Sequence, residues 1–237
     1  MKKIRFEELI LFENEDYIII NKPPFISTLD DRAEPDSVLA LARDYLPEAQ
    51  IAHRLDKETS GALAIAKNPA AYRHLAIQFE RRKVEKLYHA VCDGIHDFDE
   101  VEVNLPLYSL NKGVVRIDYG KGKESKTYFT TKEAFKMHTL VECRPITGRM
   151  HQIRVHLSSM KAPISGDETY GGRPLFLSKL KRHYNLKRDT EELPIIRRFA
   201  LHASNLAFDD EKGQRIDVQA PYPKDFAVAI KQLSKYR

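Results

Sequence analysis

Residues 53 to 61, His-Arg-Leu-Asp-Lys-Glu-Thr-Ser-Gly, form a polar stretch between apolar residues. The run that follows, Ala62 to Ala66, has the length and composition of a buried strand. The polar residues must therefore lie where strands end, and a carboxylate such as Asp56 can be partly desolvated there and still reach a cleft. On these local features alone, a catalytic Asp56 and an Asp56 that only caps a turn are equally good interpretations.

Short strand-like runs separated by turns dominate the rest of the chain. Residues 9–12 and 17–20 indicate a hairpin, and the runs between residues 101 and 143 indicate an antiparallel meander. Capping signals and helical spacing predict helices at residues 37–46 with Asp36 as N-cap, after Asn68-Pro69, from Thr147 onward, and at residues 226–233. We therefore expect an α+β fold with a central, mixed but mostly antiparallel sheet flanked by helices, and an active-site cleft.

Composition restricts the class of protein. The 237 residues suffice for a substantial core, and we expect one catalytic domain over residues 1–237. Lys and Arg total 39 against 34 Asp and Glu, and this net charge of +5 favours a polyanionic partner if it is clustered. Cys92 and Cys143 stand alone in apolar runs, as is typical of reduced cysteines in a cytoplasmic protein. Acidic residues interrupt the N-terminal apolar runs, so we expect neither a signal peptide nor a membrane segment.

A metal site is not expected either. His151 and His156 are five residues apart, whereas the histidines of a zinc-binding helix are four apart, and no acidic third ligand accompanies them.

Four stretches together resemble the motifs of the RluA-type pseudouridine synthases. Residues 53–61 match that family's pattern of His-Arg-Leu-Asp, two variable residues and Thr-Ser-Gly. The others, in the expected order, are Asn21-Lys22-Pro23-Pro24, Lys86-Leu87-Tyr88, and residues 147–156, Thr-Gly-Arg-Met-His-Gln-Ile-Arg-Val-His. The resemblance covers roughly residues 10 to 230.

This resemblance implies a pseudouridine synthase fold and an isomerase that detaches uracil from its ribose and rejoins it through carbon 5, without a cofactor. It assigns Asp56 as the essential catalytic carboxylate, Tyr88 as the tyrosine that stacks on the target base, and Arg154 as the partner of Asp56. Arg54 would take the space that a flipped base vacates, and Arg149 would hold phosphates. Whether Asp56 attacks the anomeric carbon or removes the neighbouring ribose proton to give a glycal stays open.

The resemblance also implies the partners. We expect structured ribosomal or transfer RNA, neither DNA nor a membrane, and a monomeric cytoplasmic enzyme. The chain has little room before its motifs, so we expect no separate N-terminal RNA-binding domain. The choice of uridine would then depend on loops such as the basic segment 173–198.

The chain departs from the family pattern after Pro24. The glycine usual there is absent, and Phe25-Ile26-Ser27-Thr28 takes its place. The conformation of this loop therefore does not follow from the resemblance.

Two rival functions remain at this level. An inactive relative could bind or chaperone RNA, although intact Asp56, Tyr88 and Arg154 argue against it. A hydrolase could use Asp56 as a nucleophile on a nucleoside or sugar, but that activity gives no reason for the other motifs.

Overall fold

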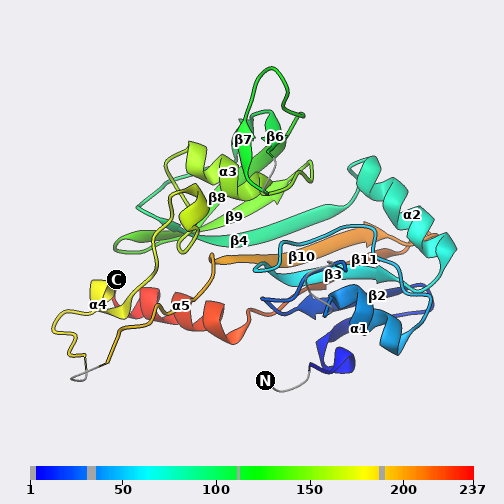
Figure 1. Cartoon of the computed structure of the whole chain (residues 1–237). Helices are drawn as coiled ribbons and strands as arrows, with labels where there is room; N and C mark the ends of the chain where they lie inside the picture. Colours follow the sequence, from blue (N-terminus) through cyan, green and yellow to red (C-terminus); the bar gives the residue numbers. More distant parts are fainter. Residues whose placement is uncertain (1–3, 31–35, 111–112, 187–189) are drawn as a thin grey trace. The chain divides into compact units, whose positions relative to one another are not determined.

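The computed structural model describes residues 4–30, 36–110, 113–186 and 190–237 (Figure 1). The chain divides into two compact units: unit 1 is Met1–Leu87 with Ala203–Pro221, and unit 2 is Tyr88–His202 with Tyr222–Arg237. Whether these units act as a single catalytic domain stays a prediction. The strands of both units pair antiparallel and helices flank them, which confirms the predicted α+β class.

Unit 1 is built around strands that are buried on both faces, β2, β3 and β10, with less buried strands beside them. Its elements are η1 (Phe6–Leu9), β1 (Ile10–Glu13), β2 (Tyr17–Lys22), α1 (Val38–Tyr45), β3 (Ser60–Ala66), α2 (Pro69–Glu80), most of β10 (Leu201–Asp209) and β11 (Arg215–Gln219). The strand order is β1-β2-β3-β10, and β11 pairs with β10. Every residue of β3 is buried, so its apolar run is continuous rather than alternating.

The register between β2 and β3 positions the motif loops. The two strands pair from Tyr17 opposite Ala66 to Lys22 opposite Gly61. The loop that leaves β2 and the loop that enters β3 therefore lie at the same end of the sheet. Gly61 has φ +117, and a Cβ there would lie 2.1 Å from the carbonyl oxygen of Ala203, so β3 can approach β10 this closely only with glycine.

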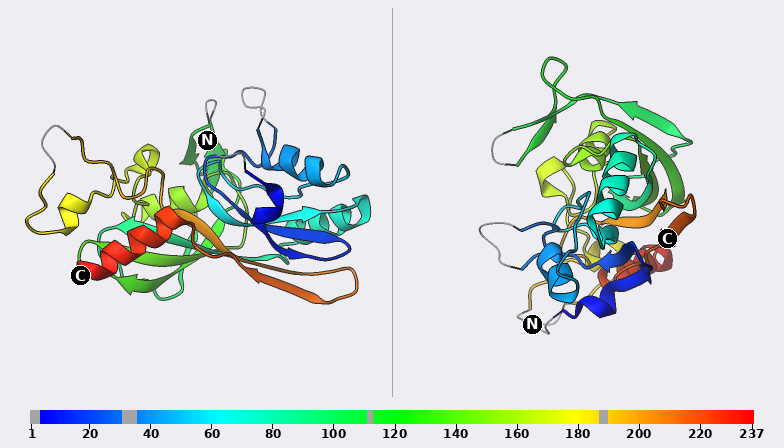
Figure 2. Two further views of the ribbon diagram at one scale, coloured as in Figure 1. Left: turned by 90° about the horizontal axis from the view of Figure 1, so that it is seen from below. Right: turned by 90° about the vertical axis from the view of Figure 1, so that its right-hand side faces the viewer.

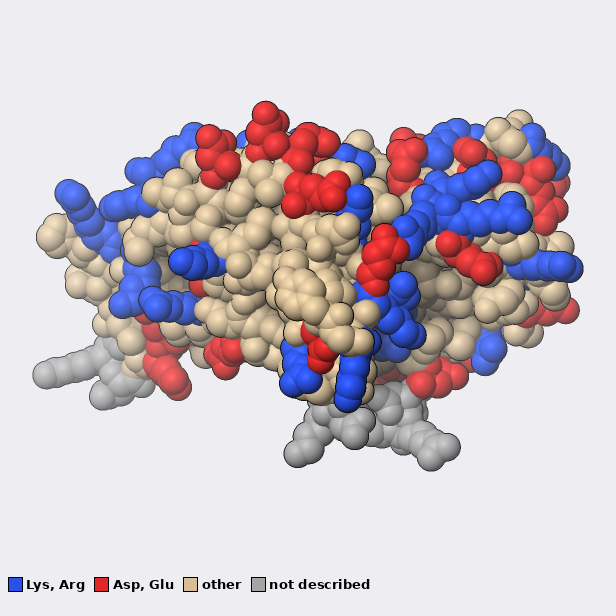
Figure 3. All heavy atoms as spheres, turned by 90° about the horizontal axis from the view of Figure 1, so that it is seen from above, with Lys and Arg blue, Asp and Glu red and all other residues tan. Residues whose placement is uncertain are grey.

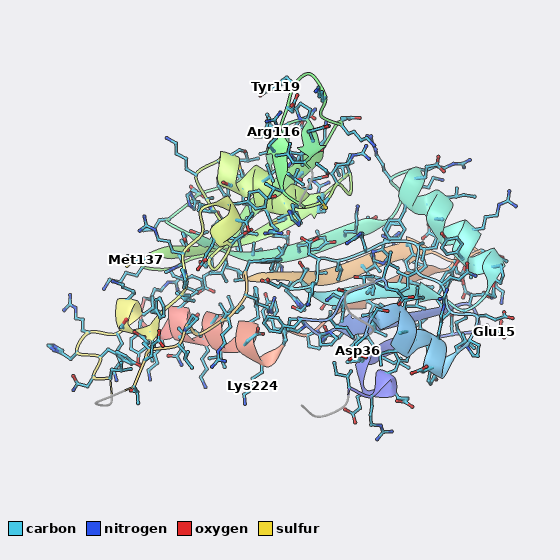
Figure 4. All side chains as sticks on the ribbon, viewed as in Figure 1. Glu15, Asp36, Arg116, Tyr119, Met137 and Lys224 are labelled. Atoms are coloured by element: carbon cyan, nitrogen blue, oxygen red, sulfur yellow. The ribbon has the colours of Figure 1, made fainter. Side chains whose placement is uncertain are left out.

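The helix caps of unit 1 test the capping signals. Asn68 caps α2 by accepting the amide of Ala71, with Pro69 at the first helical position, as predicted. The predicted N-cap Asp36 is wrong: it precedes α1 (Figure 4), and the cap is Ser37, whose Oγ accepts the amide of Ala40 at 2.9 Å.

Unit 2 contains the meander. Its elements are most of β4 (Glu85–Asp93), β5 (Val101–Asn104), β6 (Leu107–Ser109), β7 (Val115–Ile117), β8 (Lys126–Ala134), β9 (His138–Pro145), α3 (Gln152–Ser159), η2 (Glu168–Tyr170), α4 (Leu177–Leu180) and α5 (Lys224–Lys235). The order β4-β9-β8-β5 is antiparallel throughout, and β6 and β7 form a separate hairpin. Phe226, Ala229 and Leu233 of α5 (the red helix in Figure 2) belong to the same buried core as residues of β4, β8 and β9.

The predicted start of α3 at Thr147 is wrong by five residues. Residues 147–150 form a loop, His151 adopts a left-handed conformation with φ 54, and the helix begins at Gln152. The side chain of Gln152 fastens this loop, because its Oε1 accepts both the hydroxyl of Thr147 (2.7 Å) and the amide of Arg149 (3.0 Å).

The two cysteines and His156 have structural roles in the core of unit 2. Cys92 and Cys143 are free and fully buried, and burial raises the pKa of both thiols. His156 binds Thr127 and the carbonyl of Leu105, and burial lowers its pKa to about 4, so it is neutral and held in place.

Among the described residues no cluster of His, Cys, Asp and Glu could hold a metal ion, and no described helix is long and apolar enough to cross a bilayer.

Candidate active site

Asp56 lies in a tight loop whose backbone is held on both sides. On the preceding side, Oγ1 of buried Thr28 donates to the carbonyl of Leu55 (2.8 Å) and accepts the Leu55 amide (3.1 Å). On the following side, the amide of Thr59 donates to the carbonyl of Asp56 at 3.0 Å and closes a turn. The position of the Asp56 main chain is therefore fixed by the loop after β2 as well as by its own turn.

Lys22 connects the loop after β2 to the loop that contains Asp56. Its side chain is 0% exposed, and Nζ donates to the carbonyls of Pro23 (3.0 Å), Ile26 (2.9 Å) and Lys57 (3.1 Å). The amide of Phe25 also donates to the Lys57 carbonyl at 2.8 Å. An ammonium group loses its hydration when it is buried, and carbonyl oxygens replace that hydration here. Lys22 thus joins the Lys-Pro loop to the backbone beside Asp56, a role that sequence reasoning missed although it identified the motif.

His53 is a structural member of the same stretch. Its Nε2 accepts the amide of Ala64 at 3.0 Å, and its ring stacks on Phe79 with centroids 4.4 Å apart. Burial, with a smaller contribution from the charge of Lys86, lowers the pKa of His53 to about 3, so the ring is neutral at physiological pH. Arg54, which follows it, is exposed. The two neighbours thus differ: His53 supports the loop, and Arg54 is accessible to a ligand.

Arg154, in unit 2, has surroundings that the sequence did not predict. It is only 6% exposed. Its Nε and Nη2 donate to the two carboxylate oxygens of Asp167 at 2.6 and 2.8 Å. The guanidinium also lies 4.2 Å from the ring centroid of Phe199 and 4.9 Å from that of Tyr170. The plane of this cation is therefore fixed by a bidentate ion pair and two aromatic rings.

Asp167 belongs to a loop that glycines make compact. Gly166 has φ +83, and a Cβ there would lie 2.5 Å from the carbonyl oxygen of Arg198. A Cβ on Gly172 would lie 1.8 Å from the carbonyl oxygen of Ile164. Asp167 itself is 2% exposed. Sequence reasoning assigned no role to residues 166–172; the acidic residue between glycines was the available signal.

The other predicted residues of unit 2 are placed as follows. Tyr88 is the first residue of the unit, lies in β4 opposite Cys143, and is half-buried against the core. Arg149 is exposed in the loop before α3, and its Nε donates to the carbonyl of Glu124 at 3.2 Å. Arg54 and Asp56 are brought together in one loop of unit 1, whereas Tyr88, Arg149 and Arg154 belong to unit 2. The pairing of Asp56 with Arg154 and the phosphate role of Arg149 stay predictions.

On one face of the molecule, charge lies in small groups (Figure 3). On the face shown in Figure 3, Lys and Arg side chains lie in several groups with Asp and Glu between them. The turn after β7 carries Lys121 and Lys123 and is ordered by Asp118, whose side chain accepts the amides of Gly120 and Lys121. Tyr119 in this turn is 81% exposed (Figure 4).

The basic segment 173–198 is only partly described. Lys187 and Arg188 lie outside the described residues. At its end, Arg198 is buried and binds Asp225 through Nε (2.7 Å) and Nη2 (3.2 Å). Arg198 is therefore a structural cation, and the contribution of the segment to specificity stays a prediction.

Comparisons with known proteins agree with this arrangement. Residues 16–159 match the RNA pseudouridylate synthase family, a range that includes Asp56, Tyr88 and Arg154. The chain is 32% identical over 98% of its length to ribosomal large subunit pseudouridine synthase D of Haemophilus ducreyi, covering 74% of that protein. It is 34% identical over 97% of its length to ribosomal large subunit pseudouridine synthase C of Buchnera aphidicola, covering 72% of that protein.

A solved structure agrees as well. Human RNA pseudouridylate synthase domain containing 1 is 26% identical, with a TM-score of 0.68, over 94% of this chain and 87% of that one. The predicted resemblance to the RluA-type enzymes is thus confirmed by independent matches in sequence and in fold. The chain belongs to the RNA pseudouridine synthase family, enzymes that isomerise uridine in RNA to pseudouridine.

Proposed function

We propose that the protein converts one or a few uridines of ribosomal RNA to pseudouridine, with Asp56 as the essential carboxylate. The observation that carries this proposal is the family match over residues 16–159. The matched range contains an intact His-Arg-Leu-Asp motif, in a loop whose backbone accepts hydrogen bonds from Thr28 and Lys22. The names of the two relatives favour ribosomal over transfer RNA. We further propose a monomeric cytoplasmic enzyme that needs no cofactor and binds neither DNA nor a membrane.

The chemistry proposed for Asp56 begins with the ribose. The carboxylate either attacks the anomeric carbon, as in retaining glycosidases, or removes the neighbouring ribose proton to give a glycal. In both routes the bond from N1 to the sugar breaks, the bond from C5 to the sugar forms, C5 loses a proton and N1 gains one. The reaction is therefore balanced without a co-reactant.

The other residues have supporting roles in the proposal. Arg154 is the proposed partner of Asp56: its guanidinium plane is fixed because Nε and Nη2 bind Asp167, and a guanidinium has five N–H donors, enough for a second carboxylate. Tyr88 would stack on the target base and assist proton removal from C5. Because a uridine in folded RNA must flip out of its stack, exposed Arg54 would fill the vacated space and Arg149 would bind phosphate.

The proposal predicts a specific modification pattern. Ribosomal and transfer RNA from a source strain that lacks this gene would be incubated with the protein, and new pseudouridines mapped by carbodiimide-dependent reverse-transcription stops. We expect a stop at one or a few defined uridines of ribosomal RNA.

Three results would contradict this proposal in different ways. A stop in transfer RNA alone would leave the reaction but change the substrate. Binding of both RNAs without any stop would identify an RNA-binding relative that is catalytically silent. Release of free uracil would identify a hydrolase.

A further inference from the structure

Phe25 combines a strained backbone with an exposed ring. It lies in the turn that follows Pro24 and has φ 68, in the left-handed region that favours glycine. Its side chain is nevertheless 53% exposed, so burial of the ring compensates for the strain only in part. The other non-glycine residues with positive φ in the described part of the chain are polar: Arg82, Glu100, His151, Lys161 and His183.

Hydrogen bonds hold this turn in its conformation and attach it to the loop that contains Asp56. The amide of Phe25 donates to the carbonyl of Lys57 at 2.8 Å, and Nζ of Lys22 holds the carbonyls of Pro23 and Ile26 on either side. The main chain of Phe25 is therefore held at the carbonyl of Lys57, the residue after Asp56, within unit 1. Strain that persists at such a place indicates function rather than stability.

The neighbouring charges indicate the kind of partner. Arg54 and Lys57 are exposed on the loop that Phe25 contacts. An exposed aromatic ring beside cations is the arrangement with which proteins bind unpaired nucleic acid, because the ring stacks on a base while the cations bind the backbone. Since the turn is already rigid, ordering it for binding costs little conformational entropy.

We propose that Phe25 stacks on an unpaired base of the RNA substrate close to the target uridine, and so contributes to substrate selection. This inference rests on the proposed function, since it takes the ligand to be the RNA that Asp56 modifies.

The test separates RNA affinity from stability in Phe25→Gly, Phe25→Leu and Phe25→Trp variants. Phe25→Gly relieves the strain, so we expect a melting temperature equal to or above that of the wild type. Loss of stacking should raise the KM for ribosomal RNA and the Kd in filter binding by about 5- to 150-fold, with kcat at saturating RNA nearly unchanged. Phe25→Leu should bind as weakly as Phe25→Gly, and Phe25→Trp should bind as well as the wild type.

Glu100→Gly is the matched control for relief of strain. Glu100 is also an exposed residue with positive φ (49), and its removal takes away an acidic group. We expect this variant to keep the wild-type KM and Kd. If it weakens RNA binding as Phe25→Gly does, the effect of Phe25→Gly is not that of a lost ring and the proposal is wrong.

The other possible results of these measurements also decide whether Phe25 stacks on the RNA. A Kd within about twofold of wild type for Phe25→Gly or Phe25→Leu overturns the stacking role, since the loss of a stacked base costs more than this. Unfolding of Phe25→Gly overturns it too, because the ring would then be needed for packing. Failure of the proposed function is seen separately, in a wild-type protein that forms no pseudouridine, and the Kd comparison decides on Phe25 in that case as well.

Discussion

Replacing Arg154 with methionine is expected to abolish pseudouridine formation and to reduce the free energy of unfolding by about 3–5 kcal/mol. The stability loss arises because Asp167, 2% exposed, would be left as a buried carboxylate without its bidentate partner. The loss of activity follows from the proposed role of Arg154 as the partner of Asp56. Urea denaturation and the rate of pseudouridine formation measure the two effects independently.

A double variant separates these two effects. In Arg154→Met with Asp167→Leu both charges are gone, so most of the lost stability should return, because an apolar pair of similar volume replaces a buried ion pair at little cost. Activity should remain absent. Recovery of activity in the double variant would show that Arg154 serves only to neutralise Asp167.

A second Arg–Asp pair in the same unit provides the control. Arg198, whose side chain is fully buried, binds Asp225 through Nε and Nη2. Asp225→Asn leaves this buried cation without its charge partner, so it should also lower stability, whereas its activity per folded molecule should equal that of the wild type. Equal loss of activity in Asp225→Asn and Arg154→Met would indicate a general effect of destabilising unit 2.

Replacing Lys22 with methionine is the second change with a large expected effect. The carbonyls of Pro23, Ile26 and Lys57 would lose their donor while remaining close to an apolar side chain. A buried acceptor without a partner costs about 1–3 kcal/mol. The Lys57 carbonyl keeps the amide of Phe25, so the two other carbonyls give an expected loss of about 2–6 kcal/mol.

Activity should also decrease in Lys22→Met, because the backbone beside Asp56 loses one of its anchors. We expect a decrease of about tenfold or more in kcat per folded molecule, since a small displacement of a catalytic group has effects of this size. Lys67→Met is the control: Lys67 forms a partly exposed pair with Glu13 at 2.7 Å, which contributes at most about 1 kcal/mol. A Lys22→Met variant as stable as the wild type would contradict this structural role of Lys22.

The parts of the fold that sequence predicted correctly are those with local causes. The continuous apolar run of β3, the Asn68-Pro69 cap of α2 and the antiparallel meander all follow from signals within a few residues. The errors have tertiary or competing local causes. Asp36 and Ser37 carry equivalent capping signals, so the sequence alone does not show that Ser37 is the cap of α1. The helix α3 starts late because Gln152 fastens residues 147–149 as a loop.

The candidate site shows the same division. The motifs identified Asp56, Tyr88 and Arg154, but the burial of Arg154 depends on Asp167, which comes from a separate loop. Helical periodicity cannot anticipate such a partner. The acceptors of Lys22 are backbone carbonyls, up to 35 residues away, which leave no mark in the sequence. Phe25 likewise has a positive φ that its residue type disfavours, and its amide binds the carbonyl of Lys57, a contact between loops far apart in the sequence.

The central claim is that Asp56 carries the isomerisation, and tritium release tests it most directly. Ribosomal RNA labelled with tritium at C5 of uridine loses the label to water when the base is rejoined through that carbon. We expect the wild-type protein and Glu58→Gln, which changes the nearest other carboxylate in the sequence, to release tritium at similar rates, and folded Asp56→Asn to release none while still binding the RNA. Release by Asp56→Asn at a rate near that of the wild type would contradict the account.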